Sequence, residues 1–480
     1  MITKKMISGT TLLLVISLLL AFCSQDTIPD DTGSTASDTT PQPETNDLVK
    51  ELGTHDLGGR SFVILDACDY PGINVNLPAE SMNGDLINDG LFRRDSKIKE
   101  ALNCSIEYVQ ISDGTAGTNA LRDSVLAGDQ DYNLCIATIS GGRLSTLATK
   151  GLLANLCDMP YLGMDQNWWS RLMYENCRIN EKMYFTTGDI SPVMYKSPYA
   201  VYINQMLLEK YSIDVDIFGL VREGNWTIDR LNEITKPYEN DLNGDGKMHI
   251  NDDFFGLVHQ LEQNNSSMML AAAGIPLTSF DNGELSLSLT TQKVINAVEK
   301  LRDMTVDLQY DNSNDVSRVA FQHDRAIAMM YYIGYGLRNM ESDYTVVPMP
   351  KYDENQANYY CEVNGWCDSF VGIPMNVDAD FTGLVAEALA RESYQTLRPV
   401  VVDLVLKAKG SRSEESEEML DYIYNNTYVD FGYIYNFGGI ANVMAKVIFK
   451  DAPLVASVEA VSSSAKAAMD DLAKAWTQED

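Results

Sequence analysis

The chain has 480 residues, of which 45% are hydrophobic and 22% charged, and these fractions exclude a wholly disordered protein. At about 150 residues per domain, the length predicts two or three domains. The net charge is −32, from 68 acidic and 36 basic residues, and a nucleic-acid partner needs Lys and Arg to neutralise its phosphates. The composition therefore argues against a nucleic-acid-binding protein.

The N-terminus has the pattern of an export signal. Lys4 and Lys5 precede a short apolar run over residues 12–22, and Cys23 follows at its end. This run is too short for a standard membrane span of about 20 residues, although a transmembrane anchor is the alternative interpretation.

The end of this segment resembles the lipobox of bacterial lipoproteins, in which the cysteine receives lipid and becomes the mature N-terminus. Residues 20–23 read LAFC, and Phe22 stands where that motif has a small residue. The stretch that follows is rich in Ser, Thr, Asp and Pro. We therefore predict a lipoprotein signal peptide over 1–23, lipidation of Cys23 and a disordered tether over 24–51.

The eight cysteines do not indicate a disulfide framework, because no CxxC pair occurs and an odd number remains without Cys23. One bridge, such as Cys361 to Cys367, stays open. Cys135 lies in an apolar run and is expected in the core.

The first part of the folded body alternates strands and helices. Strands are expected at residues 61–65, 106–111 and 132–138. Each intervening helix carries an apolar stripe. In the first helix the stripe is formed by Ile87, Leu91, Ile98 and Leu102. In the second it is formed by Leu121, Val125 and Leu126, and Gly128 ends that helix. This order predicts a mainly parallel sheet with helices on both faces.

A second α/β unit starts near residue 199. Strands are expected at 199–204, 326–332, 344–347 and 369–373. Thr227 is a predicted helix N-cap, with Trp226 packing at that helix start. Beyond residue 381 the chain is predicted to be mostly helical. Two such sheets that face each other form a cleft that can close by a hinge.

Residues 241–252 follow the calcium-loop pattern of EF-hands and dockerins. Alternating oxygen-bearing side chains and a glycine at the sixth position are its hallmarks, and the predicted ligands are Asp241, Asn243, Asp245, the carbonyl of Lys247, and Asp252. Asp at the last position is shorter than the usual Glu. The alternative is an acidic, glycine-rich turn that binds no metal.

Several short segments, weak singly, have a specific order and spacing together. They are DLGGR (56–60), GDIS (188–191), GNWT (224–227), AIAM (326–329), PMP (348–350), EESEEML (414–420) and GYIYN (432–436). In this respect the chain resembles the extracellular solute-binding proteins of ABC importers, of the sugar-binding, maltose-binding-protein-like type found as lipoproteins in clostridia-like Gram-positive bacteria.

The resemblance implies an α/β, two-lobe, periplasmic-binding-protein-like fold of class II type, with a ligand cleft between lobes and hinge crossings. Lobe 1 is expected over 52–193 and 345–395, and lobe 2 over 194–344 and 396–480. The resemblance also implies a monomer without a catalytic cofactor, lipid-anchored at the extracellular face of the membrane. Such a protein delivers a solute, most often a sugar, to a membrane permease.

A sugar site needs aromatic faces and hydrogen-bonding carboxylates or amides. Residues of these types that follow or precede predicted strands, or lie at the lobe junction, are the candidates: Asp66, Asp69, Tyr70, Asp189, Tyr335, Trp366 and Asp368. The alternative for each is a packed or merely exposed residue. Trp168 and Trp169 are expected to pack against helices instead of lining the cleft.

The signals for catalysis are weak, because the four histidines lack metal-ligand spacing and neither GxSxG nor GxxxxGK[ST] occurs. Two other hypotheses remain beside the transport receptor. One is a cell-surface carbohydrate-active enzyme with a carboxylate pair in its cleft. The other is a calcium-dependent surface adhesion or sensor protein.

Overall fold

The computed structural model describes residues 47–69, 76–78, 80–260, 263–281, 284–305, 316–335, 337, 340–366, 368–407 and 413–477. The signal peptide with Cys23, most of the predicted tether, and Tyr70 lie outside these residues. Within them, residues from Asp47 onward belong to one unit. No helix in the described ranges is long and apolar enough to cross a bilayer.

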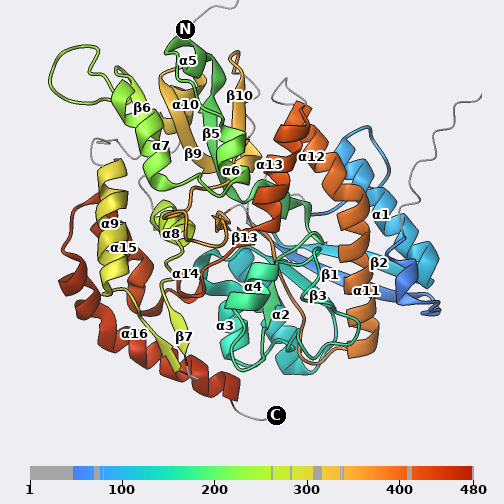
Figure 1. Cartoon of the computed structure of the whole chain (residues 1–480). Helices are drawn as coiled ribbons and strands as arrows, with labels where there is room; N and C mark the ends of the chain where they lie inside the picture. The colour runs from blue at the N-terminus through green and yellow to red at the C-terminus, as the bar shows by residue number, and fades with distance from the viewer. Residues whose placement is uncertain are drawn as a thin grey trace, which may run out of the picture. The chain divides into compact units, whose positions relative to one another are not determined.

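The helices follow one another along the whole unit (Figure 1). They are α1 (Leu86–Leu102), α2 (Gly114–Ala127), α3 (Arg143–Thr149), α4 (Arg171–Asn176), α5 (Gln205–Lys210), α6 (Ile217–Arg222), α7 (Ile228–Thr235), α8 (Gln263–Ala272), α9 (Gln292–Thr305), α10 (Val316–Gln322), α11 (Ala379–Glu392), α12 (Arg398–Lys407), α13 (Glu414–Asn425), α14 (Phe431–Tyr435), α15 (Ile440–Phe449) and α16 (Leu454–Thr477).

The first sheet has the strand order β2-β1-β3-β12-β4. Its strands are β1 (Arg60–Ala67), β2 (Cys104–Gln110), β3 (Leu134–Ala137), β4 (Phe185–Thr186) and β12 (Phe370–Gly372). β1 runs parallel to β2 and β3, as predicted, whereas β12 runs antiparallel to both β3 and β4. Four of the five strands therefore run in the same direction, which confirms a mainly parallel sheet, and β12 is its one reversed strand.

Side chains of β1 alternate between two layers of helices. Phe62 and Ile64 pack in one apolar cluster with residues of α1 and α11, whereas Leu65 and Ala67 pack in another with Leu121 of α2. This alternation follows from the two-residue period of a strand. It confirms helices on both faces of the sheet.

The second sheet has the order β10-β5-β9-β6. Its strands are β5 (Tyr199–Asn204), β6 (Phe255–Val258), β9 (Ala326–Tyr332) and β10 (Tyr344–Val347). All residues of β5 and β9 are buried, as their continuous apolar sequences predict. The predicted N-cap is also confirmed, because the Thr227 side chain accepts a hydrogen bond from the N–H of Arg230 at 3.2 Å.

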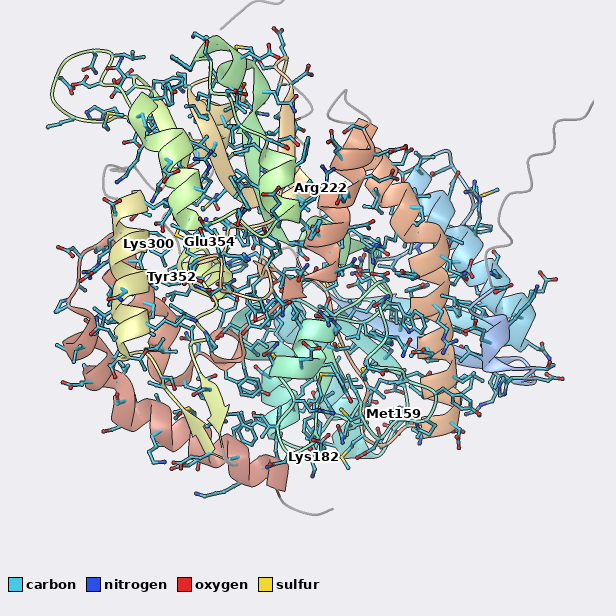
Figure 2. The ribbon with its side chains drawn as sticks, viewed as in Figure 1. Met159, Lys182, Arg222, Lys300, Tyr352 and Glu354 are labelled. Carbon is cyan, nitrogen blue, oxygen red and sulfur yellow. The ribbon has the colours of Figure 1, made fainter. Side chains whose placement is uncertain are left out.

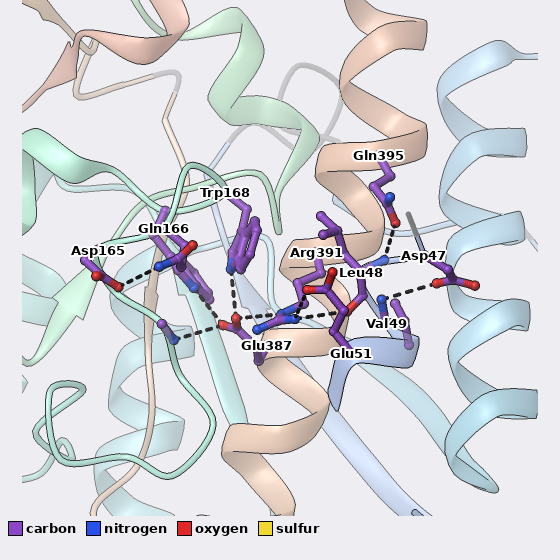
Figure 3. Close-up of polar contacts among 12 residues, drawn as sticks. Asp47, Leu48, Val49, Glu51, Asp165, Gln166, Trp168, Glu387, Arg391 and Gln395 are labelled. Carbon is purple, nitrogen blue, oxygen red and sulfur yellow. Dashed lines mark hydrogen bonds and ion pairs between the residues drawn. The ribbon is translucent and has the colours of Figure 1, made fainter. Parts of the chain in front are cut away.

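Two expected boundaries need correction. β10 pairs antiparallel with β5, so the expected return to lobe 1 at residue 345 comes too early, and β12 is the strand that rejoins the first sheet. The expected tether over 24–51 also extends too far. Leu48 N–H donates to Gln395 Oε1 at 3.1 Å, and Arg391 donates to the Leu48 carbonyl at 3.0 Å (Figure 3). Residues 47–51 are therefore docked on the folded body.

One connecting segment joins the two sheets and runs from β4 through the 3-10 helix η3 (Pro192–Lys196) to β5. A second segment, the π-helical turn η6 (Ser393–Leu397), joins α11 to α12. The buried Arg94 of α1 donates to the Ile190 carbonyl at 2.9 Å and to Ser393 Oγ at 3.2 Å. One side chain thus holds both segments.

Surface pairs also link distant parts of the chain. Arg222 of α6 lies 2.7 Å from Glu418 of α13, and Lys300 of α9 lies 4.3 Å from the centre of the Tyr352 ring (Figure 2). Cys68, Cys104, Cys135, Cys157, Cys177 and Cys361 are free thiols. Cys367, the other half of the bridge left open with Cys361, lies outside the described residues.

Candidate functional site

A cavity of about 290 Å³, here called the central pocket, lies where three parts of the chain meet. One wall follows α4, a second runs from the end of α8 to β7 (Ser279–Asp281), and the third belongs to the short sheet of β11 (Cys361–Glu362) and β13 (Thr427–Tyr428). β13 lies between α8 and α4 in Figure 1. The lining residues are Glu175, Asn176, Arg178, Ala271, Gly274, Ile275, Pro276, Thr278, Ser279, Phe280, Tyr360, Tyr428 and Phe431.

Aromatic rings form much of the apolar surface of the central pocket. The Tyr360 and Tyr428 rings meet edge to face with their centres 5.3 Å apart. Phe431 and Phe280 complete this group. Such rings pack against the apolar C–H face of a sugar.

The polar groups of the pocket are better suited to hydrogen-bond a ligand than to attract it by a net charge. Arg178 is already engaged, because it donates to Tyr174 Oη at 2.7 Å and pairs with Glu181 at 2.8 Å. Thr278 is buried, lines the pocket, and its Oγ1 has no hydrogen-bond partner among the described residues. A buried hydroxyl without a partner is costly, and this oxygen has almost no accessible surface, so a ligand reaches it only if this wall of the pocket moves.

Two buried carboxyl groups, those of Asp430 and Glu362, lie next to the lining residue Tyr428. Asp430 is the N-cap of α14, and its Oδ1 accepts from the N–H of Tyr433 at 2.8 Å. Glu362 Oε1 accepts from Ser267 Oγ at 3.1 Å and from the N–H of Asp430 at 3.3 Å. Burial raises the pKa of Asp430 to about 6 and the pKa of Glu362 well above its ordinary value.

None of the described candidates predicted from sequence lines the central pocket. Asp66 and Asp368 are buried at the first sheet. Asp66 accepts from the N–H of Cys68 at 3.2 Å, and Asp368 accepts from the N–H of Ile139 at 3.0 Å. Burial raises the pKa of both carboxyl groups. Each of these hydrogen bonds holds the backbone that directly follows a strand, β1 for Asp66 and β3 for Asp368.

Three further candidates also lie outside the pocket: Asp69 follows β1, Trp366 precedes β12, and Tyr335 follows β9. Asp69 forms an ion pair with Arg143 and accepts from the N–H of Gly114 at 2.8 Å. Trp366 has 48% of its surface exposed. Tyr335 ends the 3-10 helix η5 (Ile333–Tyr335), and its side chain is outside the described set. Their part in binding remains a prediction.

Asp189 lies at the junction of the sheets, as expected, but it is fully enclosed. It is 1% exposed, and neither carboxylate oxygen has a hydrogen-bond partner among the described residues. Arg398 Nη1 lies 3.9 Å from Asp189 Oδ2. Burial raises the pKa of Asp189 to about 7, although Arg398 acts in the opposite direction. This enclosed position favours a structural role for Asp189, in the packing of the segment between β4 and β5 against α12.

The predicted calcium loop is exposed and has the expected sharp turns. Asp241 accepts from the N–H of Gly244 at 2.6 Å and of Gly246 at 2.8 Å, and Gly246 has a φ of 78°. Asp253, one residue beyond the predicted last ligand Asp252, accepts from the N–H of Leu242 at 2.8 Å and of His249 at 2.6 Å. In the described ranges, no three His, Cys, Asp or Glu side chains are placed to hold a metal ion.

The expected packing role of the tryptophans is confirmed. Trp168 and Trp169 are buried, and each indole N–H donates to Glu387 of α11 at 2.9 Å (Figure 3 shows Trp168). Trp226 is also buried, with its N–H donating to the Pro348 carbonyl at 2.8 Å.

The sequence analysis missed the residues that build the central pocket. Tyr360 stands beside another tyrosine, Tyr428 and Phe431 lie in a separate tyrosine-rich stretch, and Asp430 directly precedes a short helix. An aspartate at such a helix start is a recognisable N-cap signal. The aromatic density and this cap are the signals that point to the site.

Comparisons with known proteins give a likeness of fold. No family model matches the chain, and no curated protein matches it. Among solved structures, a cyclo/maltodextrin-binding protein complexed with maltotetraose matches with a TM-score of 0.53 and 15% sequence identity. The match covers 87% of this chain and 96% of that chain. The chain therefore has the two-lobe α/β fold of that structure, as predicted.

Proposed function

We propose that the chain is a solute-binding protein that holds a carbohydrate, such as an oligosaccharide, in the central pocket and releases it unchanged. The observation that carries this proposal is the aromatic lining of the central pocket, which includes the paired rings of Tyr360 and Tyr428 together with Phe280 and Phe431. The similar fold of a maltodextrin-binding protein supports a sugar as the ligand.

The test is a calorimetric titration of the purified protein with maltotetraose and a panel of neutral oligosaccharides. We expect a Tyr360→Ala variant to bind the best of them about fivefold more weakly, because an aromatic contact contributes about 1 kcal/mol. Tyr161→Ala is the matched control, since Tyr161 makes a similar edge contact with His55 but does not line the pocket.

Two outcomes count against the proposal. One is a wild-type protein that binds no member of the panel. The other is a sugar that is recovered chemically altered, as a carbohydrate-active enzyme would leave it. Equal affinities for Tyr360→Ala and wild type would remove the pocket from the binding site.

We further propose that this receptor serves an ABC importer as a monomer, delivers its ligand to the membrane permease, and is anchored through lipid on Cys23 at the extracellular face of the cell membrane. The basic residues, the apolar run and the cysteine at its end support this placement. Mass analysis of the membrane-bound protein and of a Cys23→Ser variant tests the anchor.

We also propose that the loop over residues 241–252 binds calcium and is stabilised by it. For a weak extracellular site with a Kd of about 0.1 mM, about 1 mM calcium stabilises the folded protein by about 1.4 kcal/mol. The melting temperature should therefore rise on adding calcium, relative to a chelator. The Asp245→Asn variant should lose this rise, and magnesium should not replace it. An identical rise in both proteins would contradict a site in this loop.

A further inference from the structure

We propose that Asp430, which does not itself line the central pocket, sets the shape of the pocket and couples ligand binding to protonation. This inference rests on the proposed function of the pocket as the ligand site. It makes Asp430 a positioning residue.

Asp430 forms hydrogen bonds to residues of two walls of the pocket. Its Oδ2 accepts from the N–H of Leu277 at 3.0 Å and from the hydroxyl of Tyr428 at 3.3 Å. Leu277 lies between Pro276 and Thr278, which both line the pocket. Through Oδ1 the same carboxylate caps α14, which begins with the lining residue Phe431.

The loop and the helix that Asp430 joins are in direct contact. A Cβ atom on Gly432 of α14 would lie 2.6 Å from Leu277 Cβ and 3.0 Å from Thr278 Cγ2. Only a residue without a side chain allows this approach. A change in the hydrogen bond to Leu277 is therefore transmitted to the pocket wall at Thr278.

The groups that act on Asp430 electrostatically are acids. Glu362 of β11, Tyr428 of β13 and Cys177 after α4 lie around it, and none of these three carries positive charge. Glu362 Oε2 is buried and has no hydrogen-bond partner within the described ranges. Two adjacent buried carboxyl groups do not both ionise easily, so the proton stays on Glu362 and Asp430 ionises near a pH of about 6.

Protonation changes what Asp430 accepts. Ionised, its two oxygens accept the hydrogen bonds from Leu277, Tyr428 and Tyr433. Below a pH of about 6, one oxygen becomes a hydroxyl and competes with these donors. The fold itself does not suffer, because a raised carboxyl pKa favours the folded state towards acid pH. Acid therefore loosens the pocket without unfolding the chain.

The experiment measures the Kd for maltotetraose, or for the best-binding oligosaccharide, between about pH 5 and pH 8, across the pKa of Asp430. The wild-type Kd should rise about tenfold towards acid with a midpoint near 6, because protonation weakens the hydrogen bonds that this carboxylate accepts from the pocket walls. Asp430→Asn should bind about tenfold more weakly at neutral pH and show no such midpoint. Tyr428→Phe, which loses one of the three contacts, should weaken binding less and keep the midpoint.

Asp253→Asn is the matched control. Asp253 also accepts two backbone N–H groups, but it lies in the loop after α7 and outside the pocket. In chelator, this variant should melt earlier than wild type and bind with the wild-type pH profile. If Asp430→Asn keeps the wild-type profile, or if Asp253→Asn loses it, the proposal is overturned.

Amide hydrogen exchange tests the same proposal without any ligand. Exchange of the peptide over residues 271–280, corrected for the intrinsic pH dependence, should be faster in Asp430→Asn than in wild type. In wild type it should become faster below a pH of about 6. Unchanged protection in both cases overturns the inference. A wild-type protein that binds no sugar while this exchange responds as expected rejects the proposed function alone.

Discussion

The Glu387→Ala variant is expected to lose about 3–5 kcal/mol of unfolding free energy, the usual cost of removing one partner of a buried ion pair. Glu387 is fully buried and accepts both indole N–H groups of Trp168 and Trp169 at 2.9 Å. It also pairs with Arg391 at 2.9 Å (Figure 3). The N–H of Gly163 donates to Glu387 Oε2 as well, at 3.2 Å, so alanine leaves four donors without this acceptor.

Denaturation in urea measures the effect. Glu387→Gln retains one carbonyl oxygen and should lose about half as much, because one acceptor remains. Glu459→Ala, an exposed glutamate of α16, is the control and should stay within about 0.5 kcal/mol of wild type. A Glu387→Ala variant as stable as this control would show that the cluster does not hold α11.

The second large effect concerns the dependence of stability on pH. The folded state raises the pKa of Asp189 from 3.8 to about 7. Folded protein therefore keeps a proton that unfolded protein releases between these values. The contribution of Asp189 to the free energy of unfolding is therefore fully present below a pH of about 4, and it is lost as the pH rises through about 7.

Asp189→Asn removes the ionisable group. Near pH 8 we expect the variant to be more stable than wild type by up to about 4 kcal/mol, from about 1.36 kcal/mol for each unit of pKa. Near pH 4 the two proteins should differ little. Arg398 keeps Asp421 as a partner at 3.2 Å in the variant, so its charge stays compensated.

Chemical denaturation at a series of pH values checks this expectation. The control is Asp378→Asn, because Asp378 caps α11 and the Phe381 N–H, together with Arg60, holds the pKa of its carboxyl below the ordinary value. The difference between this control and wild type should stay constant between about pH 5 and 8. Parallel curves for Asp189→Asn and wild type over the same range would contradict the enclosed state of Asp189.

The strands were the most predictable part of the fold. β5 and β9 coincide with continuous apolar runs, and such runs form strands when both faces are buried. Thr227 was predictable for a similar reason, since a cap acts on its own helix. In both cases the pattern that predicts the structure is formed by residues close together in the sequence.

Pairings between distant residues were not predictable from the same patterns. Nothing local assigns β10 to the second sheet, because its partner β5 lies far earlier in the chain. Arg94 stands in a charged stretch that indicates a solvent-facing side, yet it is buried because Asp95 and Tyr108 satisfy it at 2.8 Å.

The candidate ligand residues were chosen mainly from strand ends of the two large sheets, whereas the central pocket is built by α4, by the segment from α8 to β7 and by the short sheet of β11 and β13. Glu362 and Asp430 lie far apart in the sequence and meet only because β11 pairs with β13. A buried acid among 68 acidic residues has no sequence signature of its own. The chemistry of such a pair appears only once the chain has folded.

The π-helical turn η6 constrains the number of residues between α11 and α12 as well as their identity. A π turn holds more residues than an α turn, and each residue of an α-helix advances it by about 100°. Deleting one residue here would rotate α12 out of phase with α11 and swing the buried Val401 and Val402 towards water. Homologous chains should therefore tolerate length changes in surface turns but not within this helix.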